Sequence, residues 1–428
     1  MINRLFILLP FVAMSAAIAQ DTLTVDDAVS LALKNSFMVL TGKNKTEIAV
    51  INNSPGNAGM MPKVTASITG SGGHNLIDQH QPGGAYSNTA TSAAPSVAVT
   101  FTLFDGFKML ATKNQLQKLQ EIGEINFKDT LQSVAALVIN AYYDIVSSVQ
   151  QLNGLDTARV ISREQVAITE KKVQVGTASD MDLLQAKVNF NEQTSLVLVQ
   201  ENLVQQKKIA LNMLLARSPD IDFVTSDSIP VNYNITTIPL SELEAHNMQL
   251  IAASKNVEAA TFAKSIAQSQ FWPTLSISSG YGFSHIQNSV SNPHFNQTSG
   301  LSGTVALTVP LFNGYNTVNQ VRIANLNLAN SQIGLENVKL QIKSKMFLVQ
   351  SNYERAKKVL KLEEENIGLA NKNLKIALER FRLGQSTIIE MQTIGQNFVN
   401  VLSRLVSARF AVKSYETELL RIQGELVK

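Results

Sequence analysis

Apolar residues recur at steps of three and four along two long stretches of the chain that contain no proline. One stretch lies between Gly106 and Gly176, and the other between Gly314 and Gly384. This spacing is typical of a coiled-coil seam and predicts long helices over 106–175 and 314–383, each about 105 Å long at 1.5 Å per residue. Such helices must bury their apolar stripes against other helices. The seam positions are Leu131, Val134, Val138, Ala141 and Ile145, then Leu335, Val338, Ile342, Met346, Val349, Tyr353, Ala356 and Leu360.

Before each long helix, apolar residues alternate with small or hydroxylic ones at a period of two. The alternation predicts strands at about 63–71, 96–104, 274–283 and 301–311, joined in pairs by polar loops over 70–95 and 284–300. One apolar face, one polar face and aromatic residues at the strand ends match transmembrane β-barrels. A soluble sandwich is the alternative, because alternation there also holds one face in a core. The candidates for an aromatic girdle at the membrane interface are Phe104, Phe271, Trp272 and Phe312.

Four strands are too few to close a barrel, and an open sheet edge in lipid leaves backbone groups without hydrogen-bond partners. A membrane barrel therefore requires several copies of the chain. Three copies would supply twelve strands, which leave a lumen. The sequence alone does not give the number of copies.

The same order of features occurs twice along the chain. Leu103-Phe104-Asp105-Gly106 recurs as Leu311-Phe312-Asn313-Gly314, and Met61-Pro62 matches Trp272-Pro273. The duplication predicts a first repeat over 20–217, a proline-containing linker over 218–239 and a second repeat over 240–428. Each repeat is expected to hold leading helices, two strands, a long helix and a return helix, the return helices covering 179–216 and 387–426.

The first nineteen residues have the pattern of a secretory signal peptide. Arg4 precedes an apolar segment over 5–14, and Ala17-Ile18-Ala19 matches an A-x-A cleavage site. An uncleaved anchor helix is the alternative, but it requires a longer apolar run. We therefore expect the mature protein to leave the cytoplasm.

The composition excludes several classes of protein. The 428 residues carry a formal net charge of +3 and are 16% charged, which argues against disorder and against a nucleic-acid partner. The absence of cysteine excludes disulfides and thiolate sites. No nucleotide-binding, zinc-protease or serine-hydrolase motif is present, so we expect no enzymatic activity, no metal and no cofactor.

Together these features resemble the TolC-like outer membrane factor family. Besides the duplicated strand ends, the resemblance rests on Ala141-Tyr142-Tyr143-Asp144, on Leu211-Asn212-Met213-Leu214-Leu215 and on the two tip glycines. It implies a mostly helical homotrimer in the lipid of the cell outer membrane, with a twelve-stranded barrel and a long helical barrel in the periplasm. It also implies a periplasmic adaptor protein and an inner-membrane transporter as partners, with Gly176 and Gly384 at the turns that contact the adaptor.

The function that the resemblance implies is the passive duct of a tripartite efflux pump for small toxic molecules. The exit duct of type I protein secretion is one alternative, and a structural coiled-coil envelope protein is another. A general porin does not fit, because porins carry many more strands per chain and no such long helices.

The resemblance also indicates a gate. In the family, acidic residues on the second return helix ring the closed inner end of the pore, and Glu390 occupies that place, with Asp182 as its equivalent in the first repeat. Both acids also fit capping boxes, so helix capping alone is the alternative. The chain departs from the family pattern at Phe381, where a hydrogen-bonding tyrosine can stand, and at Thr393, where a second acid can stand. These departures leave the bonds that would latch the gate undefined.

Overall fold

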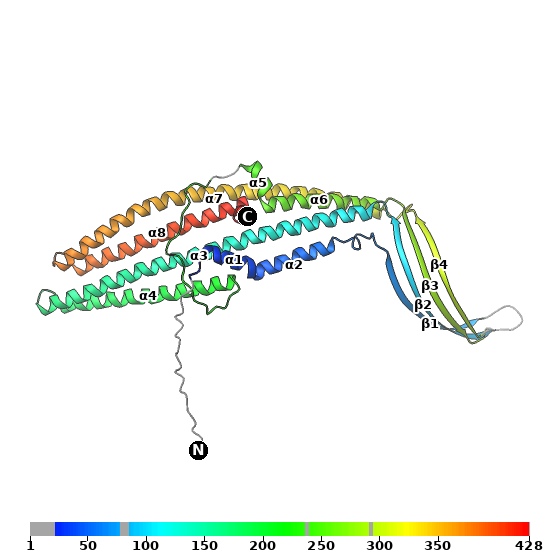
Figure 1. Cartoon of the computed structure of the whole chain (residues 1–428), viewed down its shortest axis with the longest axis horizontal. Helices are drawn as coiled ribbons and strands as arrows, with labels where there is room; N and C mark the ends of the chain where they lie inside the picture. Colours follow the sequence, from blue (N-terminus) through cyan, green and yellow to red (C-terminus); the bar gives the residue numbers. More distant parts are fainter. Residues whose placement is uncertain (1–21, 78–84, 236–238, 291–293, 428) are drawn as a thin grey trace, which may run out of the picture. The chain divides into compact units, whose positions relative to one another are not determined.

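The computed structural model describes residues 22–77, 85–235, 239–290 and 294–427, so the predicted signal peptide lies outside the described residues. The described chain is mostly helical with four antiparallel strands, as predicted (Figure 1). The first half holds α1 (Val25–Asn35), α2 (Phe37–Asn52), β1 (Lys63–Ile77), β2 (Tyr86–Phe104), α3 (Lys108–Gln174) and α4 (Asp180–Leu214). The second half holds α5 (Leu240–His246), α6 (Met248–Ser269), β3 (Thr274–Asn288), β4 (Phe295–Thr308), α7 (Asn316–Arg382) and α8 (Ile388–Gln423).

The chain forms two compact units, each assembled from distant parts of the sequence. Of the described residues, the helical unit comprises 22–39, 132–235 and 347–427. The strand unit comprises 40–77, 85–131, 239–290 and 294–346. Helices α3 and α7, of 67 residues each, belong partly to one unit and partly to the other, since the division falls within each helix.

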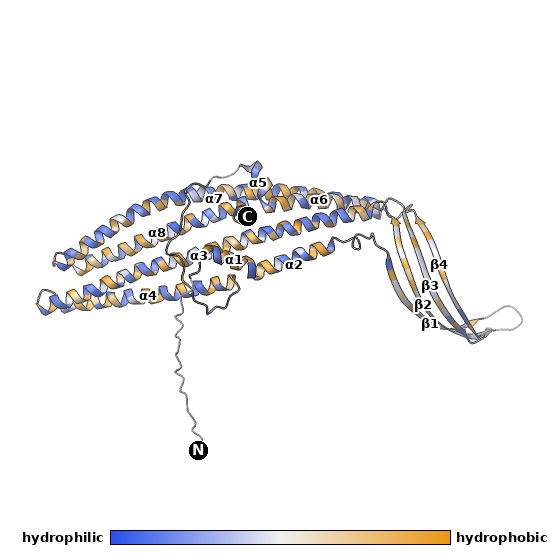
Figure 2. Cartoon of the chain, in the orientation of Figure 1, coloured by the Kyte–Doolittle hydropathy of each residue, from blue (hydrophilic) through white to orange (hydrophobic). Residues whose placement is uncertain are grey.

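In the helical unit, α3 pairs with α4 and α7 pairs with α8 as two hairpins (Figure 1). Hydrophobic and hydrophilic residues interleave along every long helix, so no helix of the described residues is both long and apolar enough to cross a membrane (Figure 2). The predicted seams are largely buried. Their fully buried members are Val134, Val138 and Ile145 in α3, and Ile342, Met346, Val349, Tyr353, Ala356 and Leu360 in α7.

Each long helix ends at a glycine in the left-handed conformation. Gly176 and Gly384 both have φ of +75°. The residue after each glycine donates its N–H five residues back, Thr177 to the Lys172 carbonyl at 2.7 Å and Gln385 to the Arg380 carbonyl at 2.8 Å. This pattern is a Schellman motif, which satisfies the last carbonyls of the helix and reverses the chain.

In each half the leading segment is broken once, into two helices. The break falls at Ser36 between α1 and α2, and at Asn247 between α5 and α6, where ψ is 133° and 117°. Each of these residues still donates its N–H to the preceding helix, and the Asn247 side chain accepts from the first N–H groups of α6. The breaks are therefore capped turns rather than frayed helix.

In the strand unit, the four strands form one antiparallel sheet in the order β1-β2-β3-β4 (Figure 1). Cross-strand pairs hold apolar residues on one face, as in Val64 opposite Val99 and Leu275 opposite Leu307. Strands β1 and β4 are the edges, and nearly all of their residues are exposed. The sheet of one chain therefore has two unpaired edges, one along β1 and one along β4.

The strands are longer than the alternation predicted, which corrects the predicted loops. Most of 70–95 and 284–300 belongs to the sheet, because the ladder continues through serine, threonine, asparagine and glycine that carry no apolar signal. Pro95, the predicted end of a loop, lies inside β2 opposite Ile68, at a position that the pairing with β3 skips. Proline is tolerated there because no ladder hydrogen bond requires its missing N–H.

At the other end, β4 stops at Thr308 rather than at residue 311. Pro310 follows two residues later and cannot donate to a ladder. The predicted helix bounds agree better with the structure than the predicted strand bounds. The observed ends of α3, α4, α7 and α8 differ from the predicted ends by one to three residues.

Replacing Gly384 tests the turn that ends α7. A Cβ here would meet no atom within 4 Å, so only the backbone conformation opposes substitution. We expect Gly384→Ala to lower the free energy of unfolding by about 1 kcal/mol, because a left-handed L-residue costs roughly 1–2 kcal/mol. Gly384→Asn is the matched control and should lose less, since asparagine adopts this conformation more readily. Denaturant unfolding followed by circular dichroism measures both variants, and equal losses would contradict the explanation.

Candidate functional site

The turns of the two hairpins in the helical unit line a common groove of about 620 Å³. The groove is half open, and it draws residues from the ends of α3 and α7 and from the starts of α4 and α8. Two of the predicted gate residues, Asp182 and Phe381, line it, together with Gly384. The other lining residues include Thr169, Lys172, Thr177, Arg382, Thr387 and Ile389.

Glu390, the third predicted gate residue, is not among the residues that line this groove; it caps α8. Its carboxylate Oε2 accepts from the Thr387 N–H and from the Ser386 hydroxyl, both at 3.0 Å. In return, the Thr387 hydroxyl oxygen accepts from the Glu390 N–H at 3.2 Å. This is a complete capping box, as the sequence pattern predicted.

Asp182 makes the same arrangement at the start of α4. Its Oδ2 accepts from the Ser179 N–H at 3.0 Å and from the Ser179 hydroxyl at 2.8 Å, while the Ser179 oxygen accepts from the Asp182 N–H at 3.2 Å. The second capping box is therefore also complete. The two acids are held in equivalent positions at the two turns.

These hydrogen bonds favour the charged form of both acids. The backbone N–H of Thr387 is the largest influence that lowers the pKa of Glu390, followed by the Ser386 hydroxyl. The backbone N–H of Ser179 likewise lowers the pKa of Asp182. Both carboxylates are therefore negative near neutral pH, and each hairpin turn carries a fixed negative charge.

Cations from the long helices join the two hairpins near the same place. Lys172, in the last turn of α3, donates from Nζ to the backbone carbonyl of Phe381 at 2.7 Å. Arg382, at the end of α7, donates from Nε to Glu164 Oε1 in α3 at 2.9 Å. Cations are favourable at helix C-termini, so each contact also offsets a helix dipole.

Phe381 supports the first of these contacts in two ways. Its ring is 3% exposed and packs in a cluster with Leu374, Ile388 and Met391. The Lys172 ammonium lies 4.4 Å from the centre of that ring, within cation–π range. The Phe381 side chain thus packs inward, and the backbone carbonyl of the same residue supplies the hydrogen-bond acceptor.

Sequence patterns alone did not identify Lys172, Arg382 or Glu164. The clustering of basic residues in the last turns of α3 and α7 was an available signal for the two cations. Their partners carried no signal, because they lie more than two hundred residues away and one of them is a backbone carbonyl.

The four aromatic girdle candidates all lie in the strand unit where strands meet helices. Phe104 ends β2 and meets Phe107 edge-on at 5.3 Å, and Phe312 follows β4 and meets Tyr315 edge-on at 5.5 Å. Phe271 and Phe312 line one small cavity of about 180 Å³. Phe271, Trp272 and Phe312 are exposed, so their rings are available to an apolar environment.

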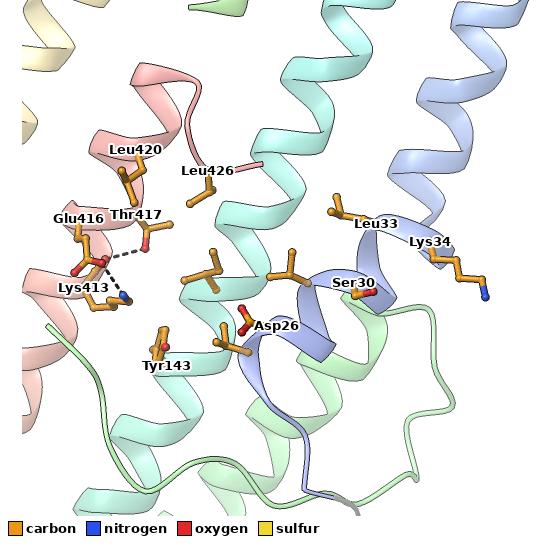
Figure 3. Close-up of a pocket in the computed structure, with 13 residues that line it drawn as sticks. Asp26, Ser30, Leu33, Lys34, Tyr143, Lys413, Glu416, Thr417, Leu420 and Leu426 are labelled. Carbon is orange, nitrogen blue, oxygen red and sulfur yellow. Dashed lines mark hydrogen bonds and ion pairs between the residues drawn. The ribbon is translucent and has the colours of Figure 1, made fainter. Parts of the chain in front are cut away.

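A second large cavity, of about 720 Å³, lies in the helical unit between α1, α3 and α8 (Figure 3). Asp26 points into it from α1, opposite Lys413 and Glu416, which form an ion pair of 2.7 Å. Burial, then Tyr142, Glu416 and Asp26, raise the pKa of Tyr143 to about 12. The Tyr143 hydroxyl therefore stays protonated at neutral pH.

Among the described residues, no three histidine, aspartate or glutamate side chains gather closely enough to hold a metal ion. His74, in β1, is engaged at both ring nitrogens by Thr89 and Ser87. His285, in β3, interacts with Gln297.

The sequence is similar to outer membrane efflux proteins and to related secretion proteins. The model of the family described as Outer membrane efflux protein matches residues 29–217 and 240–425. The chain is 20% identical over 415 residues to the outer membrane efflux protein BepC of Brucella suis biovar 1 (strain 1330), covering 96% of the chain and 87% of BepC. It is 21% identical over 328 residues to the proteases secretion protein PrtF of Dickeya chrysanthemi, covering 73% of the chain and 68% of PrtF.

The fold also matches solved structures. The chain superposes on CusC with a TM-score of 0.77 at 16% identity, covering 94% of this chain and 92% of CusC. At this level of identity the similarity concerns the fold, and it includes the four strands and the long helix pairs.

The capping boxes predict a pH dependence at the hairpin turns. A carboxylate whose pKa is lower in the folded state contributes stability above its ordinary value, 4.5 for Glu390, and that contribution is lost as pH falls through the folded pKa. We therefore expect the first turn of α8 to loosen below about pH 4.5. Amide hydrogen exchange at Thr387 and Glu390 measures this.

Glu390→Gln is the matched control for that measurement. The amide oxygen of glutamine can still accept from the Thr387 N–H, but the side chain does not titrate. Protection at residue 387 in this variant should change less with pH than in the native chain. The same pH response in both proteins would show that another group is responsible.

Proposed function

Since the chain belongs to the outer membrane efflux protein family, and is therefore an outer membrane efflux channel without enzymatic activity, we propose that it is the passive duct of a tripartite efflux pump. The duct is a homotrimer anchored in outer membrane lipid. It receives small toxic molecules from an inner-membrane transporter and a periplasmic adaptor protein. The signal peptide over 1–19 directs the chain out of the cytoplasm.

The observation that carries this proposal is the four-stranded sheet with two open edges. Backbone N–H and C=O groups along β1 and β4 require partners in lipid, and another copy of the same sheet supplies them. Three copies give twelve strands, a number that leaves a lumen wide enough for solutes. The exposed Phe271, Trp272 and Phe312 suit the interface of such a barrel with lipid headgroups.

The long helices support assembly around a channel. Large apolar side chains remain exposed along the hairpins of a single chain, which soluble monomers avoid over a large area. Neighbouring copies would cover these positions and close a helical wall. Examples are Leu184, Val188, Leu198 and Val199 in α4, and Leu348, Leu362, Leu369 and Ile376 in α7.

The hairpin turns suit an adaptor. Around Gly176 and Gly384, the apolar side chains of Val175, Met181, Leu383 and Ile389 are exposed. An exposed apolar cluster at a turn provides a docking surface for an apolar partner. These turns are the contact that we assign to the adaptor.

The same turns form the gate. Three copies of Glu390 and Asp182 placed around a narrow axis would repel one another and attract cations. The Lys172 contact with the Phe381 carbonyl and the Arg382–Glu164 ion pair hold the two hairpins of one copy together in the closed state. Opening requires these contacts to break.

Type I protein secretion is a second candidate, favoured by the similarity to PrtF, which is named as a protein of protease secretion. Deleting the gene in its own host separates the two. Loss of efflux increases sensitivity to small toxic molecules, whereas loss of secretion removes a protein from the culture medium. Restoration by the plasmid-borne gene is the control.

Single-channel recording of the purified native-size oligomer tests the duct. We expect discrete, small, cation-preferring steps in a planar bilayer, because a narrow acidic ring attracts cations. Glu390→Gln should reduce the preference for cations over anions. Unchanged selectivity in that variant would exclude Glu390 from the constriction, and the absence of any conductance from an inserted trimer would argue against a duct.

The ion pair between the hairpins predicts a gain of conductance. Glu164→Gln removes an exposed pair whose net contribution is small, so the open fraction should rise by no more than about fivefold. Arg382→Glu should open the channel further, because it places a third acid beside Glu164 and Glu379, the two carboxylates with which Arg382 forms ion pairs. Combining Arg382→Glu with Glu164→Arg restores the pair in reversed order and should restore the closed state. A double variant as leaky as Arg382→Glu would disprove the latch.

A further inference from the structure

The cavity between α1, α3 and α8 has the size and lining of a site for a small molecule. Its volume of about 720 Å³ falls within the range of roughly 300–1,000 Å³ that is usual for ligand pockets. A few polar side chains stand in a wall that is otherwise apolar, which is the usual composition of such pockets. The apolar lining residues are Val25, Val29, Leu33, Ile139, Leu420 and Leu426. A passive duct makes no use of a pocket of this kind.

Four charged side chains line the cavity, and two of them neutralise each other. Lys413 Nζ donates to Glu416 Oε1 at 2.7 Å, and Glu416 Oε2 accepts from the Asn232 N–H at 3.2 Å. The third, Lys34, extends its ammonium group away from the others (Figure 3). The charge that the cavity offers to a ligand therefore depends on the fourth, Asp26.

Asp26 presents a free carboxylate to the cavity (Figure 3). In the part of the chain that the structure describes, this carboxylate forms no hydrogen bond and no ion pair. The cap of α1 is made by the neighbouring acid instead. The Thr24 hydroxyl donates to Asp27 Oδ2 at 2.6 Å and accepts from the Asp27 N–H at 3.1 Å. Asp26 is therefore available to a bound cation.

Tyr143 adds a buried polar group to the same cavity. The residue is 4% exposed and lines the cavity from α3. Its hydroxyl forms no hydrogen bond with the described residues, although buried hydroxyls usually have a partner. Glu416 and Asp26 both raise the pKa of this hydroxyl, so it lies near the acids of the cavity. A ligand in the cavity can supply the missing hydrogen bond.

We propose that this cavity binds a small amphipathic organic cation. The ammonium group of the ligand pairs with Asp26 and donates to the Tyr143 hydroxyl oxygen, and its hydrocarbon part covers the apolar wall. Helices α3 and α8 belong to different hairpins, so a bound ligand contacts both and stabilises the folded helical unit. This site goes beyond the proposed duct and does not depend on it.

Protection from alkylation tests the site, and the chain is suited to it because it contains no cysteine. Ser30→Cys places a thiol on the wall of the cavity, and Ser407→Cys places one on an exposed position of α8 outside it. The purified native-size protein is treated with a thiol reagent. The probe is 4-phenylbutylammonium, and 4-phenylbutanol and 4-phenylbutyrate are its neutral and anionic analogues.

At about ten times its Kd, the cation should slow the alkylation of Ser30→Cys about tenfold, because only about a tenth of the sites stay empty. It should leave the alkylation of Ser407→Cys unchanged. The alcohol should protect less than the cation, and the anion should protect least, since its carboxylate would face Asp26.

Two variants that replace an acid separate the charge from the fold. Asp26→Asn should weaken the binding of the cation about fivefold, the upper end for an exposed ion pair, and should leave the binding of the alcohol unchanged. Asp27→Asn is the matched control, because it removes the same charge one residue away and its amide oxygen can still accept from Thr24. This control should keep the native affinity.

Four results would overturn the proposal. Equal protection by the three compounds would exclude a cation site, and no protection up to the solubility limit of the probe would exclude any site for it. Equal protection of both thiols would place the probe outside the cavity. If the thiol at residue 30 fails to react in the assembled protein while the thiol at residue 407 reacts, a neighbouring copy covers the cavity. None of these results bears on the conductance that tests the duct.

Discussion

Hydrogen bonding of the strand backbones is the constraint on which this structure depends. A sheet of four strands can satisfy its inner groups alone, but β1 and β4 each present a full row of N–H and C=O groups to their surroundings. Water can satisfy these groups, whereas lipid cannot. A chain that enters the outer membrane with this sheet must therefore meet its own copies.

The hairpin turns combine stability with charge in the same atoms. The Glu390 and Asp182 carboxylates accept from the N–H of Thr387 and of Ser179, the residues that cap their helices, so they cannot be removed without loosening the turns. The same oxygens keep a negative charge at the end of each hairpin. Capping and charge are therefore complementary roles of one side chain: the observed hydrogen bonds confirm the two capping boxes, and the gate role is the one that we propose.

Local signals explain what could be predicted from the sequence. The steps of three and four predicted α3 and α7 to within two residues, and the glycines at 176 and 384 marked their turns, because helix periodicity and left-handed glycine are properties of neighbouring residues. The strand ends were missed because their ladder continues through polar residues, whose pairing depends on a backbone partner rather than on side-chain pattern.

Contacts between distant segments were also beyond sequence patterns. Nothing near Lys172 indicates the Phe381 carbonyl, and nothing near Arg382 indicates Glu164. The sequence does not show that the Phe381 ring packs inward against Leu374 and Met391. Such contacts follow from tertiary packing, which a single sequence does not display.

The two contacts between the hairpins differ in their response to dissolved salt. The Arg382–Glu164 pair is exposed, so dissolved ions weaken its attraction. The weakening grows with salt, because the Debye length falls from about 8 Å at physiological ionic strength to about 3 Å at 1 M. The Lys172 ammonium binds a neutral carbonyl beside a buried aromatic ring, and screening affects it much less. The two hairpins are thus joined by one contact that weakens as the ionic strength of the surrounding solution rises and by one that changes much less.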